Sequence, residues 1–375
     1  MPTEFGFSSS ASGNEGSPVP PPLLPPPAKK SSGRSGYGRS RGWMIATFIL
    51  GFLLLWRLPT PWSGREAVRS VGVRSGKVQE ILIESQGSEN KIAVIDITGV
   101  ISAGGRGRED IGLVEWIKDQ LSVAAKDPGV KAIVVRIDSP GGEVLASDEI
   151  YRQLKRFQDR QQIPVVATLG SLAASGGYYV ASSCTWIVAN ELTITGSIGV
   201  IMHGYNYRGL LNKVGIRPRV FKSGKLKDML SGDRIKEDEL PEESAIVQAL
   251  IDRTHHKFKQ VIEGGRGEAL VRNHGAGQAL SVDWEEYTDG RIISGEQAHA
   301  FGFVDELGDF ETAVARAMML TDIESADLVQ YQRPVSFANL FRFLGTAETP
   351  ALHIDLGLEF PRLQSGKTYF LWLPQ

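Results

Sequence analysis

The chain has 375 residues, of which 42% are hydrophobic and 22% are charged, so it can bury a large core and is not disordered throughout. Its 41 basic and 43 acidic side chains are dispersed, which argues against nucleic acid as a partner. The single cysteine, Cys184, excludes an intrachain disulfide and is expected to be a small buried core residue.

The first 42 residues are rich in Ser, Gly and Pro. They contain too few apolar side chains to form a core, so residues 1–42 are predicted to be a disordered tail. The proline run at 18–27 could dock onto a polyproline-binding module, but an extended, solvated spacer is the favoured interpretation.

An apolar segment follows at 43–57, in which residues 43–56 are uncharged; Arg41 precedes it and Arg57 closes it. It is shorter than the ~20 residues that a spanning helix needs, so a signal peptide and a buried core helix are the alternatives. It has no polar face, and no small-residue cleavage site follows it, which favours an uncleaved membrane anchor. Basic residues are more numerous before it than after it. We therefore expect a single-pass protein of the cell membrane, with its N-terminus in the cytoplasm and its body outside.

The body of the chain alternates strand and helix patterns. Nearly continuous β-branched runs at 92–97 and 132–137 are typical of strands covered on both faces, and helical spacing at 113–124 lies between them. Two further strands are predicted at 163–169 and 186–189. Helices are predicted at 148–157, at a segment that begins near Ser175, and at 242–262, where Gly264 and Gly265 are expected to end the helix.

This order of elements predicts an α/β fold. Near the end, Ser294 and Gln297 have the spacing of a capping box at the start of a helix. We expect residues 58–90 to be a linker, residues 91–330 to form one catalytic domain, and residues 331–375 to be a C-terminal extension.

Three glycine-rich turns each follow an apolar strand, at 138–142, 170–179 and 195–199. The ends of neighbouring strands would bring these turns together. Glycine pairs let main-chain N–H groups approach a ligand closely, as an oxyanion pocket requires. Such turns are also common for structural reasons, so they do not by themselves indicate an enzyme.

A serine nucleophile needs a base to take its proton. The six histidines stand in no recognisable motif, and Ala173 replaces the first glycine of a lipase-type G-x-S-x-G at Ser175. Ser88 and Lys91 form a literal S-x-x-K, but in a linker-like setting without its partner motifs. The segment 222–228, with three lysines, remains the notable candidate for a base.

Several of these motifs occur together and in order, and they resemble the signal peptide peptidase A (SppA) family of Ser/Lys proteases. They are Gly141-Gly142, the runs 171–179 and 195–199, Lys222-Ser223-Gly224 with Lys227-Asp228, and Asp289-Gly290-Arg291 through Gly302-Phe303-Val304-Asp305.

The resemblance implies a Clp-protease/crotonase fold of repeated β-β-α units. It also implies Ser175 as the nucleophile, Lys227 as the general base and Ser197 as the hydroxyl that orients the lysine. A family member of this short type is expected to be a homo-oligomer that shares each site between protomers. Because Ser175 would start a helix, the N–H of Gly176 is the expected oxyanion donor, with Gly142 as the second.

A lysine can act as the base near neutral pH only if its pKa falls from ~10.4 to roughly 7, which burial can achieve. Asp228 must then not pair with Lys227. The predicted function is therefore a membrane-anchored serine endopeptidase for released signal peptides or other short apolar peptides, without cofactor or metal. The alternatives are a crotonase-type acyl-CoA enzyme that uses Glu143, and a non-catalytic membrane scaffold.

Overall fold

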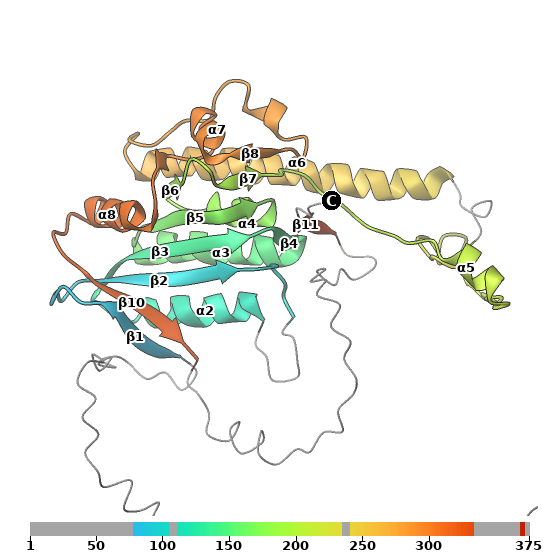
Figure 1. Ribbon diagram of the computed structural model, residues 1–375, viewed down its shortest axis with the longest axis horizontal. Coiled ribbons are helices and arrows are strands. Elements are labelled where there is room, and N and C mark those ends of the chain that lie inside the picture. Colours follow the sequence, from blue (N-terminus) through green and yellow to red (C-terminus); the bar gives the residue numbers. More distant parts are fainter. Residues whose placement is uncertain (1–77, 105–111, 235–240, 334–367, 372–375) are drawn as a thin grey trace, which may run out of the picture. The chain divides into compact units, whose positions relative to one another are not determined.

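The computed structural model describes residues 78–104, 112–234, 241–333 and 368–371 (Figure 1). Its main sheet has nine strands in the order β1-β10-β2-β3-β5-β6-β9, with β7 paired to β5 and β8 paired to β7. The strands are β1 (Gln79–Glu84), β2 (Lys91–Thr98), β3 (Val130–Ser139), β5 (Val165–Ala174), β6 (Trp186–Ala189), β7 (Ile194–Gly196), β8 (Ile292–Ser294), β9 (Glu306–Leu307) and β10 (Asp327–Gln332).

Most neighbouring strands of this sheet are parallel; the antiparallel pairs are β1 with β10 and β7 with β8. The predicted α/β class is therefore confirmed as a mixed α/β fold with a largely parallel sheet. The helices are α2 (Leu113–Ala124), α3 (Val144–Gln161), α4 (Gly176–Ala181), α5 (Arg208–Lys213), α6 (Pro241–Arg272), α7 (Gly295–Ala300) and α8 (Phe310–Thr321).

The sheet is buried on both faces. Along β2, Ala93, Ile95 and Ile97 belong to a large core that also contains buried residues of α2, α3, α4 and α6. Ile92 belongs instead to a second, smaller core with Ala313 of α8. Successive side chains of a strand point to opposite faces, so covering both faces produces the continuous apolar runs seen in the sequence.

Two boundaries differ from those predicted. Residues 79–84 form the edge strand β1, antiparallel to β10, where the sequence predicts a linker. Helix α6 continues through Gly264 and Gly265 to Arg272 instead of ending at the glycine pair. A Cβ on Gly265 would clash with the carbonyl oxygen of Ser182, so this glycine permits close packing of α6 on α4 rather than ending the helix.

The predicted capping box is present, since the Gln297 N–H donates to Ser294 Oγ at the start of α7. Cys184 is buried, as predicted, and burial raises the pKa of its thiol to about 12. The predicted membrane segment at 43–57 lies outside the described residues. Among the described helices, none is long and apolar enough to cross a membrane.

A separate two-stranded sheet lies beside the turn after β3. It pairs β4 (Gly141–Glu143) with β11 (Tyr369–Leu371) in antiparallel fashion. Residues 369–371 belong to the predicted C-terminal extension, and their pairing brings the end of the chain to the glycine turn that was predicted to supply an oxyanion donor.

Candidate active site

Ser175 lies at the tight turn between β5 and α4. Its N–H donates to the Gly196 carbonyl at 2.8 Å, and its own carbonyl accepts the Tyr179 N–H at 2.8 Å. The backbone has a φ of 53° and a ψ of −115°, a conformation that non-glycine residues rarely adopt and that costs about 1–3 kcal/mol. Such strain is concentrated at functional sites, and here it fixes the direction of the Ser175 side chain.

The hydroxyl of Ser175 is buried and has no hydrogen-bond partner within the described part of the chain; the residue as a whole is only 1% exposed. Leaving a buried hydroxyl unpaired costs about 1–3 kcal/mol, so an unpaired hydroxyl at this position calls for an explanation. A structural serine would normally bond to a neighbouring backbone group.

The two predicted oxyanion donors lie next to Ser175. Gly176 begins α4, and Gly142 lies on β4, where Ile101 bridges to it. A Cβ on Gly176 would come within 3.1 Å of the Gly142 nitrogen, so the two main chains approach each other closely. Gly141 has a φ of 97°, which favours glycine, and a Cβ there would lie 2.6 Å from the Gly176 nitrogen.

Ser197 is brought to the same place by strand pairing. β7 pairs with the end of β5, with Gly196 opposite Ala174, so Ser197 follows directly beside Ser175. Its N–H donates to the Arg291 carbonyl at 2.7 Å, and the residue is 7% exposed. The structure therefore unites four of the five predicted site residues, namely Ser175, Ser197, Gly142 and Gly176.

Lys227 is the exception. It lies on a segment that we call the arm, residues 201–234, which carries α5 and leads towards the start of α6. In Figure 1, α6 extends past the sheet and α5 lies near that end. Lys227 is exposed, and the Ser175 hydroxyl has no bond to it. The single chain thus does not join the predicted nucleophile to its predicted base.

The two other lysines of the segment 222–228 are paired. Lys222 Nζ lies 2.8 Å from the Asp228 carboxylate, and this hydrogen bond holds the pKa of Asp228 below its usual range. Lys225 pairs with Glu242 at 2.6 Å. No salt bridge of Lys227 occurs among the residues that the structure describes, so Asp228 neutralises Lys222 rather than the predicted base.

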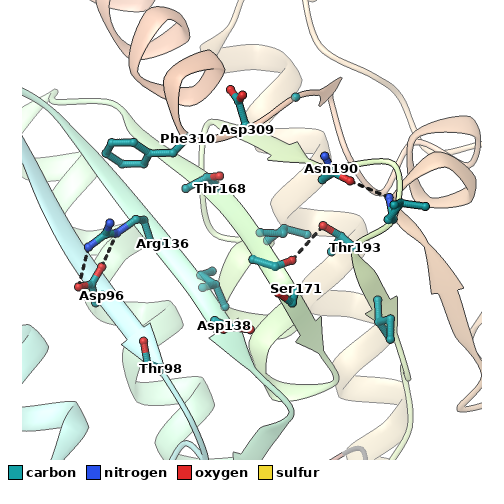
Figure 2. A pocket seen from close by; sticks show the side chains of 16 residues that line it. Asp96, Thr98, Arg136, Asp138, Thr168, Ser171, Asn190, Thr193, Asp309 and Phe310 are labelled. Atoms are coloured by element: carbon teal, nitrogen blue, oxygen red, sulfur yellow. Dashed lines mark hydrogen bonds and ion pairs between the residues drawn. The ribbon is translucent and has the colours of Figure 1, made fainter.

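One cavity lies away from these residues. It has a volume of about 640 Å³ and is bordered by Asp96, Arg136, Ser171 and Phe310 among others (Figure 2). Arg136 is paired with Asp96 at 2.6 Å, and Phe310 starts α8, which packs on the sheet face opposite to α4. Ser175 does not line this cavity, so its size does not identify it as the catalytic site.

Comparisons with known proteins identify the family. The profile of peptidase family S49 matches residues 157–324. A protein of Synechocystis sp. that is named as a protease is 41% identical over 299 residues, which cover 76% of this chain and 96% of that protein. The chain belongs to peptidase family S49.

Other S49-type relatives agree. A protein of Enterococcus faecium named as a signal peptide peptidase SppA is 30% identical over 306 residues, covering 78% of this chain and 84% of that protein. The chloroplastic serine protease SPPA of Arabidopsis thaliana is 30% identical over 269 residues, 71% of this chain and 36% of that protein. Among solved structures, a membrane-bound stomatin-specific protease variant with a substrate peptide matches at a TM-score of 0.39 and 16% identity, covering 68% of this chain and 97% of that one. The predicted SppA resemblance is confirmed, and this S49 chain is a serine peptidase.

Two further motifs of this S49 peptidase make contacts that hold the fold together. Arg291, held by a salt bridge to Asp289 that lowers the pKa of Asp289 to about 2, offers its carbonyl to Ser197. Asp305 forms a fully buried ion pair with Arg266 of α6 and also accepts the Ile187 N–H at 2.8 Å. These residues have structural roles that their place in the motif did not reveal.

The sequence did not predict the aromatic cluster that packs on α4. Tyr179 of α4 and Phe258 of α6 lie with their ring centroids 4.9 Å apart, and Phe370 of β11 packs on both. Tyr179 belongs to the motif 171–179 and follows Ser175 by one helical turn, so its position near the serine could be expected. Phe258 and Phe370 are distant in sequence and carried no such signal.

Proposed function

We propose that this S49 peptidase is a membrane-anchored serine endopeptidase that cuts peptides outside the cytoplasm with a Ser175–Lys227 dyad. The observation that carries the proposal is the Ser175 hydroxyl, which is buried, unpartnered among the described residues and set on a strained turn. Next to it lie the N–H groups of Gly142 and Gly176, where a developing oxyanion needs donors.

In the proposed reaction, Lys227 takes the proton of Ser175 as the oxygen attacks the carbonyl carbon of the substrate. The N–H groups of Gly142 and Gly176 stabilise the negative oxygen, a contribution of about 10²–10³-fold in kcat for each such donor. The lysine then protonates the departing amine, which leaves an acyl-enzyme on Ser175. Water, deprotonated by the same lysine, releases the carboxylate product and restores the serine.

The base must come from a neighbouring copy of the chain. The arm exposes an unusual amount of apolar surface, and α5 contains no buried residue. A second copy is the proposed occupant, because the same arm holds Lys227 and the serine site lacks a base. Burial of the arm against that copy would also provide the low-polarity surroundings that a lysine base requires. The most exposed apolar side chains of the arm are Tyr205 (77%), Leu210 (62%), Val214 (60%) and Phe221 (82%).

Substrates and location follow from the remaining expectations. The apolar segment 43–57 would anchor the chain in the cell membrane, with residues 1–42 in the cytoplasm and the catalytic domain outside. Released signal peptides or other short apolar peptides are the proposed substrates, in agreement with the name of the Enterococcus faecium relative. For the fold, we propose the Clp-protease/crotonase superhelix of repeated β-β-α units.

Subunit complementation tests this proposal. Ser175→Ala and Lys227→Ala proteins, each inactive alone, are mixed, dissociated and reassembled, and peptide cleavage is measured. If each site joins a serine of one chain to a lysine of the next, about a quarter of the sites in a 1:1 mixture are intact. Activity near that fraction supports the shared dyad. No activity in oligomers shown to contain both variants excludes it.

A further inference from the structure

The arm contains one buried residue, and that residue is charged. Over residues 201–234 only Arg234 is buried, at 7% exposed. Its partner Glu243 is 6% exposed and is the only buried residue in the first part of α6, over 241–257. Arg234 Nη1 lies 2.9 Å and 2.8 Å from the two carboxylate oxygens of Glu243. The arm is thus joined to the start of α6 by a buried ion pair.

A buried ion pair of this kind is weak evidence for a stabilising role. The desolvation of two charges offsets most of their attraction, and apolar side chains of similar volume are often as stabilising. What such a pair can fix is geometry, because a guanidinium binds its partners in set directions. The two segments that it joins here are the one that carries the proposed base and the helix that packs on α4 through Gly265.

The same guanidinium also binds the residue next to Lys227. Arg234 Nη1 donates to the Asp228 carbonyl at 3.3 Å, and its Nε lies 3.8 Å from the Asp228 carboxylate. The Ser231 N–H donates to the same carbonyl at 3.1 Å, and the Lys227 N–H donates to the Gly224 carbonyl at 3.2 Å. The turn that carries Lys227 is therefore held at its main chain by Arg234.

The Asp228 carboxylate is bound by two cations. Lys222 Nζ lies 2.8 Å and 2.9 Å from its two oxygens, and Arg234 is the second cation. A carboxylate beside a lysine favours the charged form of that lysine and so prevents it from acting as a base. Because both cations engage Asp228, Lys227 has no counter-ion among the residues that the structure describes.

We propose that Arg234 is a positioning residue for the base: it holds the Lys227 turn on α6 and keeps the Asp228 carboxylate engaged, so that Lys227 can accept the proton of Ser175. The inference rests on the proposed peptidase function and deepens it. In this role Arg234 acts through Asp228 and Lys227 and needs no contact with the reacting atoms. The other possible role of Arg234 is purely structural, as a staple between the arm and α6.

The paired charges near Lys227 balance one another. The three cations and three carboxylates are Lys222, Lys225, Arg234, Asp228, Glu242 and Glu243. Arg208 of α5 adds a contact to the Asp233 carbonyl at 3.0 Å. Removing one cation favours the ammonium form of Lys227 and should move the limb on which activity rises with pH to higher pH. Removing one carboxylate should move the same limb to lower pH.

The test measures kcat/KM against pH for full-length Arg234→Met and Asp228→Asn, with assembly checked by sedimentation velocity. Arg234→Met should raise the limb by about 0.5–1 pH unit, since a charge gained or lost near a lysine shifts its pKa by about one unit. Asp228→Asn should lower it by a similar amount. Arg234→Met should also reduce kcat at least about tenfold with little change in KM, because the base is displaced.

Three comparisons show whether Arg234 acts through Asp228. Lys225→Met removes an exposed cation from the same segment and should move the limb by less than about 0.2 pH unit, because solvent screens that charge. In the Asp228→Asn background, Arg234→Met should move the limb less than about half as far as in wild type, because the carboxylate that it restrains is gone. Arg234→Lys keeps the charge but not the planar fork, so it should restore the limb and only part of kcat.

The outcomes separate the two proposals. A limb that stays in place in assembled Arg234→Met, or that moves equally far in Lys225→Met, overturns the positioning role. The peptidase function then still stands, provided that cleavage depends on Ser175 and Lys227. Cleavage that survives in Lys227→Ala overturns the proposed dyad itself.

Asp228→Asn keeps the inference testable if Arg234→Met does not assemble. It removes the carboxylate but leaves the pair of Arg234 with Glu243 intact, so the arm stays joined to α6. A limb that falls in this variant supports the role assigned to Asp228. A limb that stays in place or rises overturns the inference.

Discussion

The serine half of the site and the arm that carries Lys227 are built in opposite ways. Around Ser175 the neighbouring main chains are packed so closely that a Cβ on Gly141 or Gly142 would clash, and Ser197 is fixed by strand pairing. Along the arm, by contrast, the side chain of Phe221 is 82% exposed and Lys227 is exposed. One half is complete within a single chain, and the other presents apolar surface to the solvent.

The difference shows what each half needs in order to function. An oxyanion pocket depends on donors held in fixed positions, which a rigid core provides without a partner. A lysine base depends on being buried, which an exposed arm acquires only in an assembly. A peptidase arranged in this way would remain inactive as a monomer, since its nucleophile and its base meet only after association.

The largest expected effect comes from removing either member of the proposed dyad. Ser175→Ala and Lys227→Ala should each lower kcat/KM for peptide cleavage by about 10⁴-fold or more, because residues that act as one unit fail together. Lys227→Ala should keep the wild-type unfolding temperature, and Ser175→Ala should not lower it, because it removes an unpaired buried hydroxyl. Lys222→Ala and Lys225→Ala serve as matched controls and should stay active. An inactive Lys225→Ala beside an active Lys227→Ala would reassign the base.

Substitutions in the arm should impair assembly and activity rather than the stability of the monomer. Phe221→Asp should dissociate the oligomer and reduce activity at least about tenfold, since an exposed hot-spot aromatic often contributes 2 kcal/mol or more to an interface. The unfolding temperature of the monomer should not change. Met319→Asp, at an exposed position of α8, is the control. Sedimentation velocity and peptide cleavage at the same concentrations check this, and a fully active monomer of Phe221→Asp would contradict the shared site.

Substitutions in the core, by contrast, should lower the stability of the folded chain. Arg266 and Asp305 are a buried pair with side chains 1% and 0% exposed. Removing one partner leaves the other charge buried alone, which costs about 3–5 kcal/mol. Arg266→Met should therefore lower the free energy of unfolding in urea by that amount. Arg266→Met combined with Asp305→Asn, which removes the buried charge but keeps an oxygen that can accept the Ile187 N–H, should recover a large part of it. A double variant no more stable than the single one would count against the pair.

The sequence predicted those elements best whose pattern lies within a few neighbouring residues. The β-branched runs, the capping box at Ser294 and the helix start after Ser175 are local patterns, and all three are confirmed. The glycine pair in α6 was wrongly predicted to end the helix, because glycine is a helix breaker in sequence terms. The close approach of Gly265 to Ser182, which explains the glycine, exists only in the folded chain.

The site was predicted in the same uneven way. The positions of Gly142, Gly176 and Ser197 next to Ser175 agree with the motif order, because strand ends bring consecutive turns together. The strand β11 and the contact of Phe258 with Phe370 join residues more than a hundred positions apart, and no periodicity records such a contact. The roles of Ser175 and Lys227 remain predictions until the variants above are measured.

The smallest expected effect concerns a charge cluster at the opposite end of the strands from Ser175. Lys91 Nζ contacts Glu80 at 2.7 Å and Asp127 at 2.8 Å, and so ties the edge strand β1 to the turn before β3. Burial opposes the charge on Lys91, but its hydrogen bonds to Asp127 and Glu80 raise its pKa above 10.5. Burial likewise opposes the charge on Asp127, yet the hydrogen bond from Lys91 lowers its pKa below 3.8.

These shifts fix how the stability depends on pH. The lysine contribution is complete below pH 10.5 and is lost as the pH rises through the raised pKa. The Asp127 contribution is complete above pH 3.8 and is lost as the pH falls through the lowered pKa. Lys91→Met should therefore lower the unfolding free energy by about 1–3 kcal/mol between these limits, since Glu80 is left buried without its partner. The deficit should shrink in acid, as Asp127 becomes protonated. Peptide cleavage at 25 °C should not change, because the cluster lies at the opposite end of the strands from Ser175. A stability deficit that stays constant down to pH 2 would refute the role assigned to Asp127.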